Sequence, residues 1–420
     1  MRNDALHLLH HYLYFCKMKY LIGVGLFLIF SNAIGQHCIS DRYSEVSIFD
    51  TAQIIIQSNI EYGVATHYFT GQSTSLKMDV YFPNQNIDPI ANRPFILNIH
   101  GGGFAGGDKN ELASESFEFA RRGFVVANVN YRLGWNCDNV ICFNCFESNL
   151  QKAVYCAVQD ARAALRFAFD HREEWGIDEN WMFISGESAG SITAMNSTFW
   201  DQEEADAQVS AGFSTEVGSL DASGNTLPGG YQIKAIIDQC GAVPNLEALD
   251  NNTNIPYIGF HDSNDCVVPY NGGSLIACFC NGFLYYYGSN SIHNRRISTG
   301  ECSELHTAPQ PLLPNHCTYP KLNIVKLSSC FLKRVMCGFC INFADDDINA
   351  QPICSSLSQT IPAPVSGCTY QNASNFNPDA TSDNGSCIFN NTCAADLNAD
   401  GIVGVADLIT FMAAFGTICE

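Results

Sequence analysis

Basic side chains are scarce in this 420-residue chain, which has 21 lysines and arginines against 42 aspartates and glutamates. The formal net charge is −21 at pH 7. A surface this acidic repels phosphate backbones, so we expect no binding of nucleic acid. Beyond residue 35 the sequence also lacks an apolar run of the ~20 residues that cross a bilayer, so we expect no transmembrane span.

The composition excludes a mostly disordered chain, because apolar residues make up 46% and aromatic residues 12%. The length suggests two or three domains, one of them large enough to bury a core. The 20 cysteines are unusual for a cytosolic enzyme and typical of an exported protein with disulfides.

The first 35 residues have the layout of a secretory signal peptide. Met18 and Lys19 begin a positive start, residues 21–30 are apolar, and small residues at Ala33 and Gly35 suit cleavage after Gly35. We therefore expect Met18 to be the true start and the protein to be secreted or held at the cell surface. Removal of residues 1–35 leaves an odd number of cysteines, which implies a free thiol or an intermolecular bridge.

Residues 36–344 alternate short apolar runs with helix-length segments. The runs typical of strands lie at residues 76–82, 95–100, 124–129, 181–185, 234–237, 257–260 and 303–307, and residues 149–174 have helical spacing. This alternation predicts an α/β fold with a mainly parallel sheet flanked by helices. Two polar stretches, 135–149 and 201–230, are expected to be loops or caps over a site.

Gly186-Glu187-Ser188-Ala189-Gly190 matches the G-x-S-x-G pattern of a nucleophile elbow. It follows the predicted strand 181–185 and precedes residues 191–199, which can form a helix. In such a tight strand-to-helix turn the glycines are needed because neighbouring side chains would clash. Ser188 is therefore the candidate nucleophile.

A glycine-rich segment, His100-Gly101-Gly102-Gly103-Phe104, follows another predicted strand. Three glycines allow backbone N–H groups to turn towards a developing oxyanion, and each such donor contributes about 3–4 kcal/mol in acyl transfer. Together with the elbow downstream, this segment predicts an oxyanion hole.

A serine nucleophile needs a base and an orienting carboxylate, which follow it in the order acid and then histidine. Asp265 is the preferred acid because it lies far enough beyond strand 257–260 to turn towards the site, with Asp262 as the alternative. His316 is the preferred base because it lies in the loop after the last strand. His306, within that strand, is the alternative.

These motifs resemble those of serine esterases of the α/β-hydrolase superfamily. The likeness covers residues 50–340 and extends to the carboxylesterase and hormone-sensitive-lipase-like branches, including secreted bacterial feruloyl- and acetyl-esterase-like members. It implies an α/β-hydrolase fold and an acyl-enzyme mechanism that needs no cofactor. It also implies oxyanion donors at the backbone N–H groups of Gly102, Gly103 and Ala189. The expected substrate is a short-acyl or polysaccharide-linked ester.

Two other functions fit the same fold. A serine peptidase is one, although no propeller domain is present and the glycine-rich segment favours esters. An inactive adhesion or scaffold protein is the other, but it would lack a nucleophile, acid or base, and candidates for all three are present.

The cysteines have two C-x-x-C pairs, Cys142 with Cys145 and Cys337 with Cys340. Such pairs can form a four-thiolate zinc site, but their wide separation and the expected export favour structural disulfides.

The composition changes after residue 344. Residues 345–366 are predicted to be a linker, followed by a small module over 367–390 that a Cys368–Cys387 disulfide would close, and a second module over 391–420. The second module resembles a dockerin-type calcium loop and implies a cell-surface or cohesin-like partner. Its expected Ca²⁺ ligands are Asp396, Asn398, Asp400, Ile402 through its carbonyl, and Asp407.

Overall fold

The computed structural model describes residues 37–38, 41–88, 90–135, 146–250, 254–277, 284–309 and 315–354, and residues 366–367, 373–377, 382–383, 386 and 388. The chain divides into two compact units, residues 1–355 and 356–420. The expected leader over 1–35, the pair Cys142 and Cys145 and the expected calcium loop lie outside the described residues.

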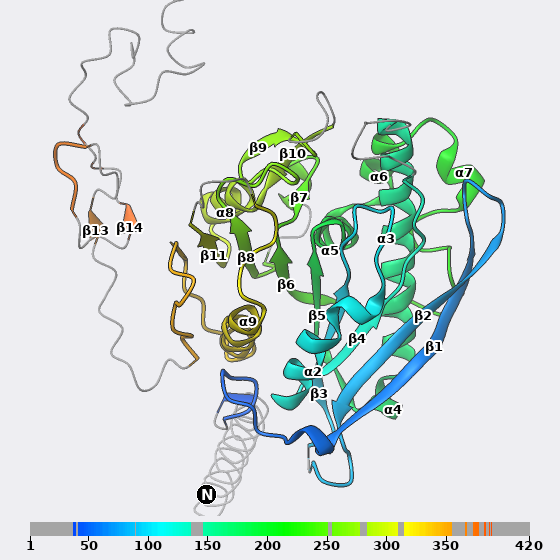
Figure 1. Ribbon diagram of the computed structural model, residues 1–420, viewed down its shortest axis with the longest axis horizontal. Helices are drawn as coiled ribbons and strands as arrows, with labels where there is room; N and C mark the ends of the chain where they lie inside the picture. Colours follow the sequence, from blue (N-terminus) through cyan, green and yellow to red (C-terminus); the bar gives the residue numbers. More distant parts are fainter. Residues whose placement is uncertain are drawn as a thin grey trace, which may run out of the picture. The chain divides into compact units, whose positions relative to one another are not determined.

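A nine-stranded sheet forms the centre of the first unit (Figure 1). Its strand order is β1-β2-β4-β3-β5-β6-β8-β11-β12. The strands are β1 (Ile54–Thr66), β2 (Ser73–Pro83), β3 (Arg93–Ile99), β4 (Val125–Val129), β5 (Ile177–Glu187), β6 (Ile233–Gln239), β8 (Tyr257–Asp262), β11 (Ser303–Ala308) and β12 (Phe343–Asp345). Pairing is antiparallel at β1–β2 and β2–β4 and parallel from β4 to β12. This is an α/β-hydrolase fold, as the sequence predicts.

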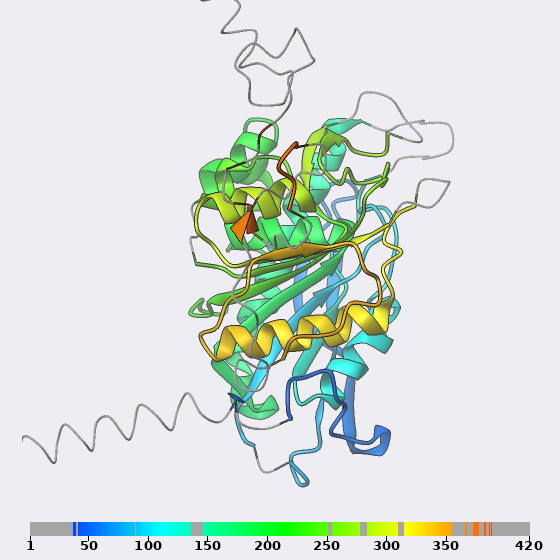
Figure 2. The same ribbon diagram turned by 90° about the vertical axis from the view of Figure 1, so that its left-hand side faces the viewer.

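Helices cover both faces of the sheet because adjacent side chains of a strand point to opposite faces. On β3, Leu97 packs in the core under α3 (Glu147–Asp170) and α5 (Ala189–Phe199). Ile96 packs in the core under α2 (Ala113–Arg121) and α9 (Lys321–Met336). Figure 2 shows α2 and α9 on one side of the sheet. The central strands are therefore buried on both faces, which explains why their sequences are continuous apolar runs.

The remaining elements are short. They are α4 (Arg172–Trp175), α6 (Gln202–Gln208), α7 (Phe213–Val217), α8 (Ser289–Ser298), β7 (Ala242–Val243), β9 (Gly272–Ser274), β10 (Tyr285–Gly288), the 3₁₀ turns η1 (Thr51–Gln53), η2 (Lys109–Leu112) and η3 (Glu247–Asp250), and, in the second unit, β13 (Ser366–Gly367) and β14 (Ser382–Asp383). Two of these helices, α6 and α7, lie in the polar stretch 201–230. Within the described ranges, no helix has both the length and the apolar character to cross a membrane.

Four disulfides link described cysteines: Cys38–Cys337, Cys240–Cys317, Cys302–Cys340 and Cys330–Cys354. Because Cys337 and Cys340 each have a different disulfide partner, they do not form half of a zinc site. Cys156, buried in α3, is the free cysteine of this part of the chain.

The first unit extends further than the sequence predicts. β12 pairs with β11, and Cys354 is bonded to Cys330 of α9. Residues 345–354, predicted to belong to the linker, therefore belong to the first unit. The predicted linker is rich in residues that favour turns. Its sequence did not indicate the pairing of β12 with β11 or the choice of Cys330 as the partner of Cys354.

A buried ion pair joins the loop after β4 to α3. Arg132 Nη2 lies 2.8 Å from Asp160 Oδ1, and Asp160 Oδ2 accepts a hydrogen bond from the Arg132 backbone N–H at 2.7 Å. The two side chains are 1% and 0% exposed. Removal of one partner would leave a charge without compensation in the core.

We expect Asp160→Asn to lower the free energy of unfolding by about 3–5 kcal/mol, because Arg132 would stay buried without its counter-ion. The matched control is Asp221→Asn, whose carboxylate pairs with Arg162 and Arg166 but is 62% exposed. This control should cost less than about 1 kcal/mol. Urea unfolding followed by fluorescence measures both, and equal losses would contradict the assignment.

Candidate active site

The nucleophile elbow forms between β5 and α5. Ser188 has φ 53° and ψ −119°, a strained conformation for a residue with a side chain. A Cβ at Gly186 would lie 2.3 Å from the Gly190 carbonyl carbon, and one at Gly190 would lie 2.0 Å from the Ile99 oxygen. Gly186 is therefore required for the turn to close on itself, and Gly190 for the turn to pack against the end of β3, which leaves Ser188 at the carboxyl edge of the sheet.

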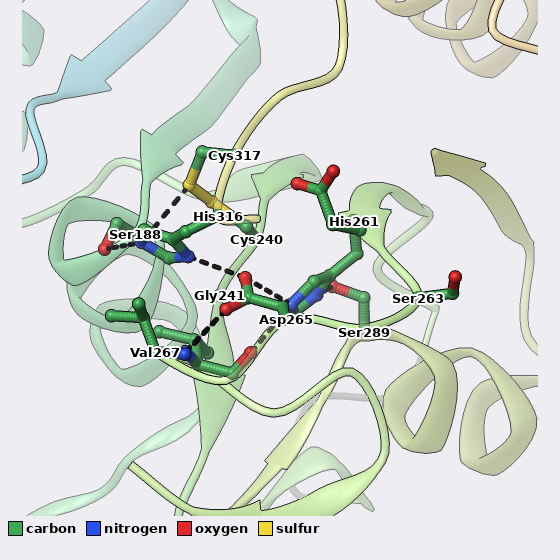
Figure 3. Close-up of polar contacts among 12 residues, drawn as sticks. Ser188, Cys240, Gly241, His261, Ser263, Asp265, Val267, Ser289, His316 and Cys317 are labelled. Carbon is green, nitrogen blue, oxygen red and sulfur yellow. Dashed lines mark hydrogen bonds and ion pairs between the residues drawn. A yellow bond between two sulfur atoms is a disulfide. The ribbon is translucent and has the colours of Figure 1, made fainter. Parts of the chain in front are cut away.

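Three of the predicted residues meet at this edge, as Figure 3 shows. His316 Nε2 lies 2.8 Å from Ser188 Oγ, and His316 Nδ1 lies 2.6 Å from Asp265 Oδ2. Because a carboxylate only accepts hydrogen bonds, Nδ1 carries the proton and Nε2 is free to accept one from the hydroxyl. The serine hydroxyl is thus hydrogen-bonded to an imidazole, and the imidazole to a carboxylate.

The Asp265 carboxylate is buried and has further donors. Its Oδ1 accepts hydrogen bonds from the backbone N–H groups of Val267 at 2.8 Å and Val268 at 3.0 Å. Burial alone would raise the pKa of this carboxyl, but hydrogen bonds from His261 and His316 outweigh burial and hold its pKa below the usual value. Asp265 is therefore a carboxylate at neutral pH.

The two alternative residues have structural contacts. Asp262 accepts hydrogen bonds from the Thr318 backbone N–H at 2.8 Å and from the Thr318 hydroxyl, and so holds the loop that carries His316. His306 is buried on β11, with Nδ1 3.1 Å from Asp345 and its ring stacked on Phe260. In this structure it is Asp265, rather than Asp262, that is hydrogen-bonded to His316. It is His316, rather than His306, that is hydrogen-bonded to Ser188.

A disulfide lies directly beside the histidine. Cys317 follows His316 in the sequence and is bonded to Cys240, the residue after β6 (Figure 3). The Cys317 sulfur lies 3.4 Å from His316 Nε2. Since sequence alone cannot pair this many cysteines, this restraint on the histidine loop was not predicted.

The glycine-rich segment after β3 lies against the elbow. A Cβ at Gly101 would lie 3.4 Å from Ser188 Cβ. Gly102 and Gly103 have φ values of 100° and 61°. The Gly102 carbonyl oxygen accepts hydrogen bonds from the backbone N–H groups of Ala105 and Gly106. Among the described residues, none accepts a hydrogen bond from the N–H groups of Gly102, Gly103 or Ala189. These three predicted donors are therefore available to a ligand.

A charged cluster of Lys321, Glu115 and Glu187 lies next to the elbow and was not predicted. Lys321, at the start of α9, has its Nζ 2.7 Å from Glu187 Oε2 and 3.1 Å from Glu115 Oε1, and donates to Gln239 Oε1 at 2.9 Å. Burial lowers the pKa of Lys321, but Glu115 and Glu187 outweigh it and raise the pKa overall. The cluster ties α9 to the residue that precedes Ser188. A lone lysine at a helix start gives no sequence signal of such partners.

The described residues also contain two groups of potential metal ligands. One consists of Cys240, His316 and Cys317, and the other of Glu45, Cys330 and Cys354. Both groups include a disulfide, so their sulfur atoms are not thiolates. Neither group fits a metal ion.

The chain is similar to a protein family and to several known proteins. A family model described as BD-FAE matches residues 78–265, which include Ser188 and Asp265. The "Crystal protein" of Dictyostelium discoideum is 30% identical over 118 residues, which cover 28% of this chain and 20% of that protein. Esterase B1 of Culex pipiens is 29% identical over 126 residues, which cover 29% of this chain and 22% of that protein.

Among solved structures, the thermophilic esterase Est2 from Thermogutta terrifontis, with propionate bound, is 18% identical. The match has a TM-score of 0.43 and covers 70% of this chain and 97% of that one. The matched part of this chain spans 20% of the length of the Dictyostelium "Crystal protein" and 22% of the length of Esterase B1.

We expect Ser188 to react with a fluorophosphonate probe and His316→Gln to slow this labelling at least about 100-fold, because the base that activates the hydroxyl is lost. His306→Gln is the matched control and should label within about threefold of the unmodified chain. Labelling is followed by intact-mass spectrometry. The assignment of the base would be wrong if a folded His306→Gln protein lost labelling and His316→Gln kept it.

Proposed function

We propose that this protein is a serine carboxylic-ester hydrolase. The observation that carries the proposal is the hydrogen-bonded series Ser188–His316–Asp265, with Oγ to Nε2 at 2.8 Å and Nδ1 to Oδ2 at 2.6 Å. The match to the BD-FAE family model and the similarity to Esterase B1 support the same activity.

The mechanism follows from the position of the protons. As Ser188 Oγ attacks the ester carbonyl carbon, His316 Nε2 takes its proton, and Asp265 stabilises the imidazolium through the Nδ1–H. The N–H groups of Gly102, Gly103 and Ala189 donate to the oxyanion. His316 then protonates the departing alcohol, which leaves an acyl group on Ser188. Water, deprotonated by His316, then attacks the acyl carbonyl carbon. The bond to Ser188 Oγ breaks, His316 returns its proton to Oγ, and the acid is released.

We extend the proposal to the substrate class and the location. Short-acyl esters, including acetyl and feruloyl esters carried by polysaccharides, are supported by the resemblance to secreted bacterial esterases of these kinds. Export is supported by the leader-like residues 1–35 and by the disulfides in the first unit, since disulfides persist in oxidising compartments.

We also propose that residues 391–420 bind one Ca²⁺ ion and attach the enzyme to a surface or a cohesin-like partner. The sequence supports the ion site through the oxygen-bearing side chains of Asp396, Asn398, Asp400 and Asp407 and the carbonyl of Ile402. The ion takes no part in the ester chemistry proposed above.

The full chain should hydrolyse p-nitrophenyl esters, with rates that fall from short to long acyl groups. Ser188→Ala should lower kcat at least about 1,000-fold because the nucleophile is lost. Ser197→Ala, which removes a hydroxyl bonded to Thr193 O on the same helix, is the control and should keep its activity. Full activity in Ser188→Ala would refute the proposal. Cleavage of peptides but not of esters would favour the serine peptidase. The absence of any hydrolysis would favour the inactive scaffold protein.

Calorimetric titration with Ca²⁺ should reveal one site in the full chain. Asp400→Asn should weaken binding at least about tenfold, because one anionic ligand of the loop is replaced by a neutral one. Asp383→Asn, outside the loop, is the control. The same affinity in both variants, or no binding in the unmodified chain, would contradict the calcium proposal.

A further inference from the structure

A second histidine lies against the carboxylate that orients His316. His261, on β8, is 1% exposed, and its Nε2 lies 3.3 Å from Asp265 Oδ2 and 3.1 Å from the Val268 carbonyl oxygen (Figure 3). Because a carbonyl oxygen cannot donate, Nε2 carries a proton. The mechanism proposed above assigns no role to this residue.

The other ring nitrogen of His261 faces a serine. Nδ1 lies 2.6 Å from Ser289 Oγ, and Ser289 Oγ lies 2.6 Å from Asp238 Oδ2. A hydroxyl has one proton, so Ser289 donates either to Asp238 or to His261 but not to both. The state of Asp238 decides which.

Asp238 is fully buried on β6 and is surrounded by hydrogen-bond donors. Its Oδ1 accepts from the Ser191 hydroxyl and, at 2.8 Å, from the Gly241 N–H; its Oδ2 accepts from the Tyr257 hydroxyl at 2.5 Å and from Ser289. The three donors other than Ser289 match an ionised carboxylate, and its remaining lone pair faces Ser289 Oγ. Because a hydrogen bond to a carboxylate is stronger than one to a neutral imidazole nitrogen, the Ser289 proton points to Asp238. Ser289 Oγ then accepts a hydrogen bond from His261 Nδ1–H.

Both nitrogens of His261 are thus donors. We propose that His261 is a positively charged positioning residue, held as an imidazolium between Asp238 and Asp265, and that it fixes and charge-balances the carboxylate that orients His316. The proposal rests on the proposed ester hydrolase function. Burial lowers the pKa of His261, but Asp265 and then Asp238 outweigh burial and raise it overall, which agrees with the count of donors.

The other ionisable groups around His261 do not change this balance. Tyr270 contacts the ring edge-on, and burial raises its pKa, as it does that of Tyr257. The neighbouring residue Asp262 is bonded to Thr318, and the residue opposite His261 on β11 is the uncharged Thr307. One cation therefore lies between two anions.

The charge on His261 has a consequence for the pH profile. A cation beside Asp265 opposes the addition of a proton to the coupled Asp265–His316 pair, so the pair stays in its active form to lower pH. Without that cation the pair takes up a proton at higher pH. Loss of the charge therefore moves the acidic limb of kcat/KM upwards.

His261→Gln should raise the midpoint of the acidic limb by about one pH unit, because a unit charge within a few ångströms is lost. On that limb kcat/KM should fall about tenfold, with less than about a threefold change on the plateau. Ser289→Ala, which removes the acceptor of Nδ1–H, should move the limb in the same direction by less. A limb that stays in place in both folded variants would overturn the proposal.

His293→Gln is the matched control. His293 is also buried, and its Nδ1 lies 2.7 Å from Ser303 Oγ, but burial and then His306 lower its pKa to about 4, so it is neutral. The same substitution there removes a histidine–serine pair without removing a charge, and the limb should not move. An equal shift in this variant would show a general packing effect and overturn the proposal.

A second measurement needs neither activity nor a variant that folds. In ¹⁵N-histidine-labelled full chain at about pH 6.5, the ordinary pKa of histidine, NMR should show His261 protonated on both nitrogens and His293 on one. A singly protonated His261 would overturn the proposal. An unmodified chain that hydrolyses no ester would refute the proposed function instead, and the NMR result would still decide the charge of His261.

Discussion

The site depends on one buried anion, the Asp265 carboxylate. Its Oδ1 accepts hydrogen bonds from the backbone N–H groups of Val267 and Val268. Its Oδ2 accepts a hydrogen bond from His316 Nδ1–H and also lies close to His261 Nε2. A buried carboxylate without such donors would gain a proton instead of keeping its charge. The orientation of His316, and with it the hydrogen bond to Ser188, follows from that charge being kept.

The sheet places these groups together because its central strands are parallel. The glycine-rich segment follows β3, Ser188 follows β5, and the Asp265 loop follows β8, so all three leave the same edge. The site could be predicted for this reason: each motif is local, and the order of strands along the chain brings the motifs to one edge. His316 could be preferred over His306 because a loop beyond β11 can turn towards that edge, whereas a strand residue is fixed in the sheet.

What could not be predicted are contacts between residues far apart in sequence. The Cys240–Cys317 disulfide joins positions 77 residues apart, and no spacing rule selects that pair among so many cysteines. His261 is separated from Asp238 and Ser289 by whole elements, so its charge becomes visible only when donors are counted in three dimensions. Helix α6 is different, because Asp201 and Glu204 form a capping box that the sequence does contain.

The loop that carries His316 is restrained in two physically different ways. The disulfide to Cys240 limits the backbone covalently, whereas Asp262 accepts hydrogen bonds from the backbone N–H and the hydroxyl of Thr318. Neither restraint sets the rotation of the imidazole ring, which is left to Asp265. The backbone restraints therefore reduce the entropy that the ring would lose on binding Asp265, while the buried charges around Asp265 decide which tautomer the ring adopts. The backbone position of His316 and the tautomer of its ring are controlled by separate parts of the structure.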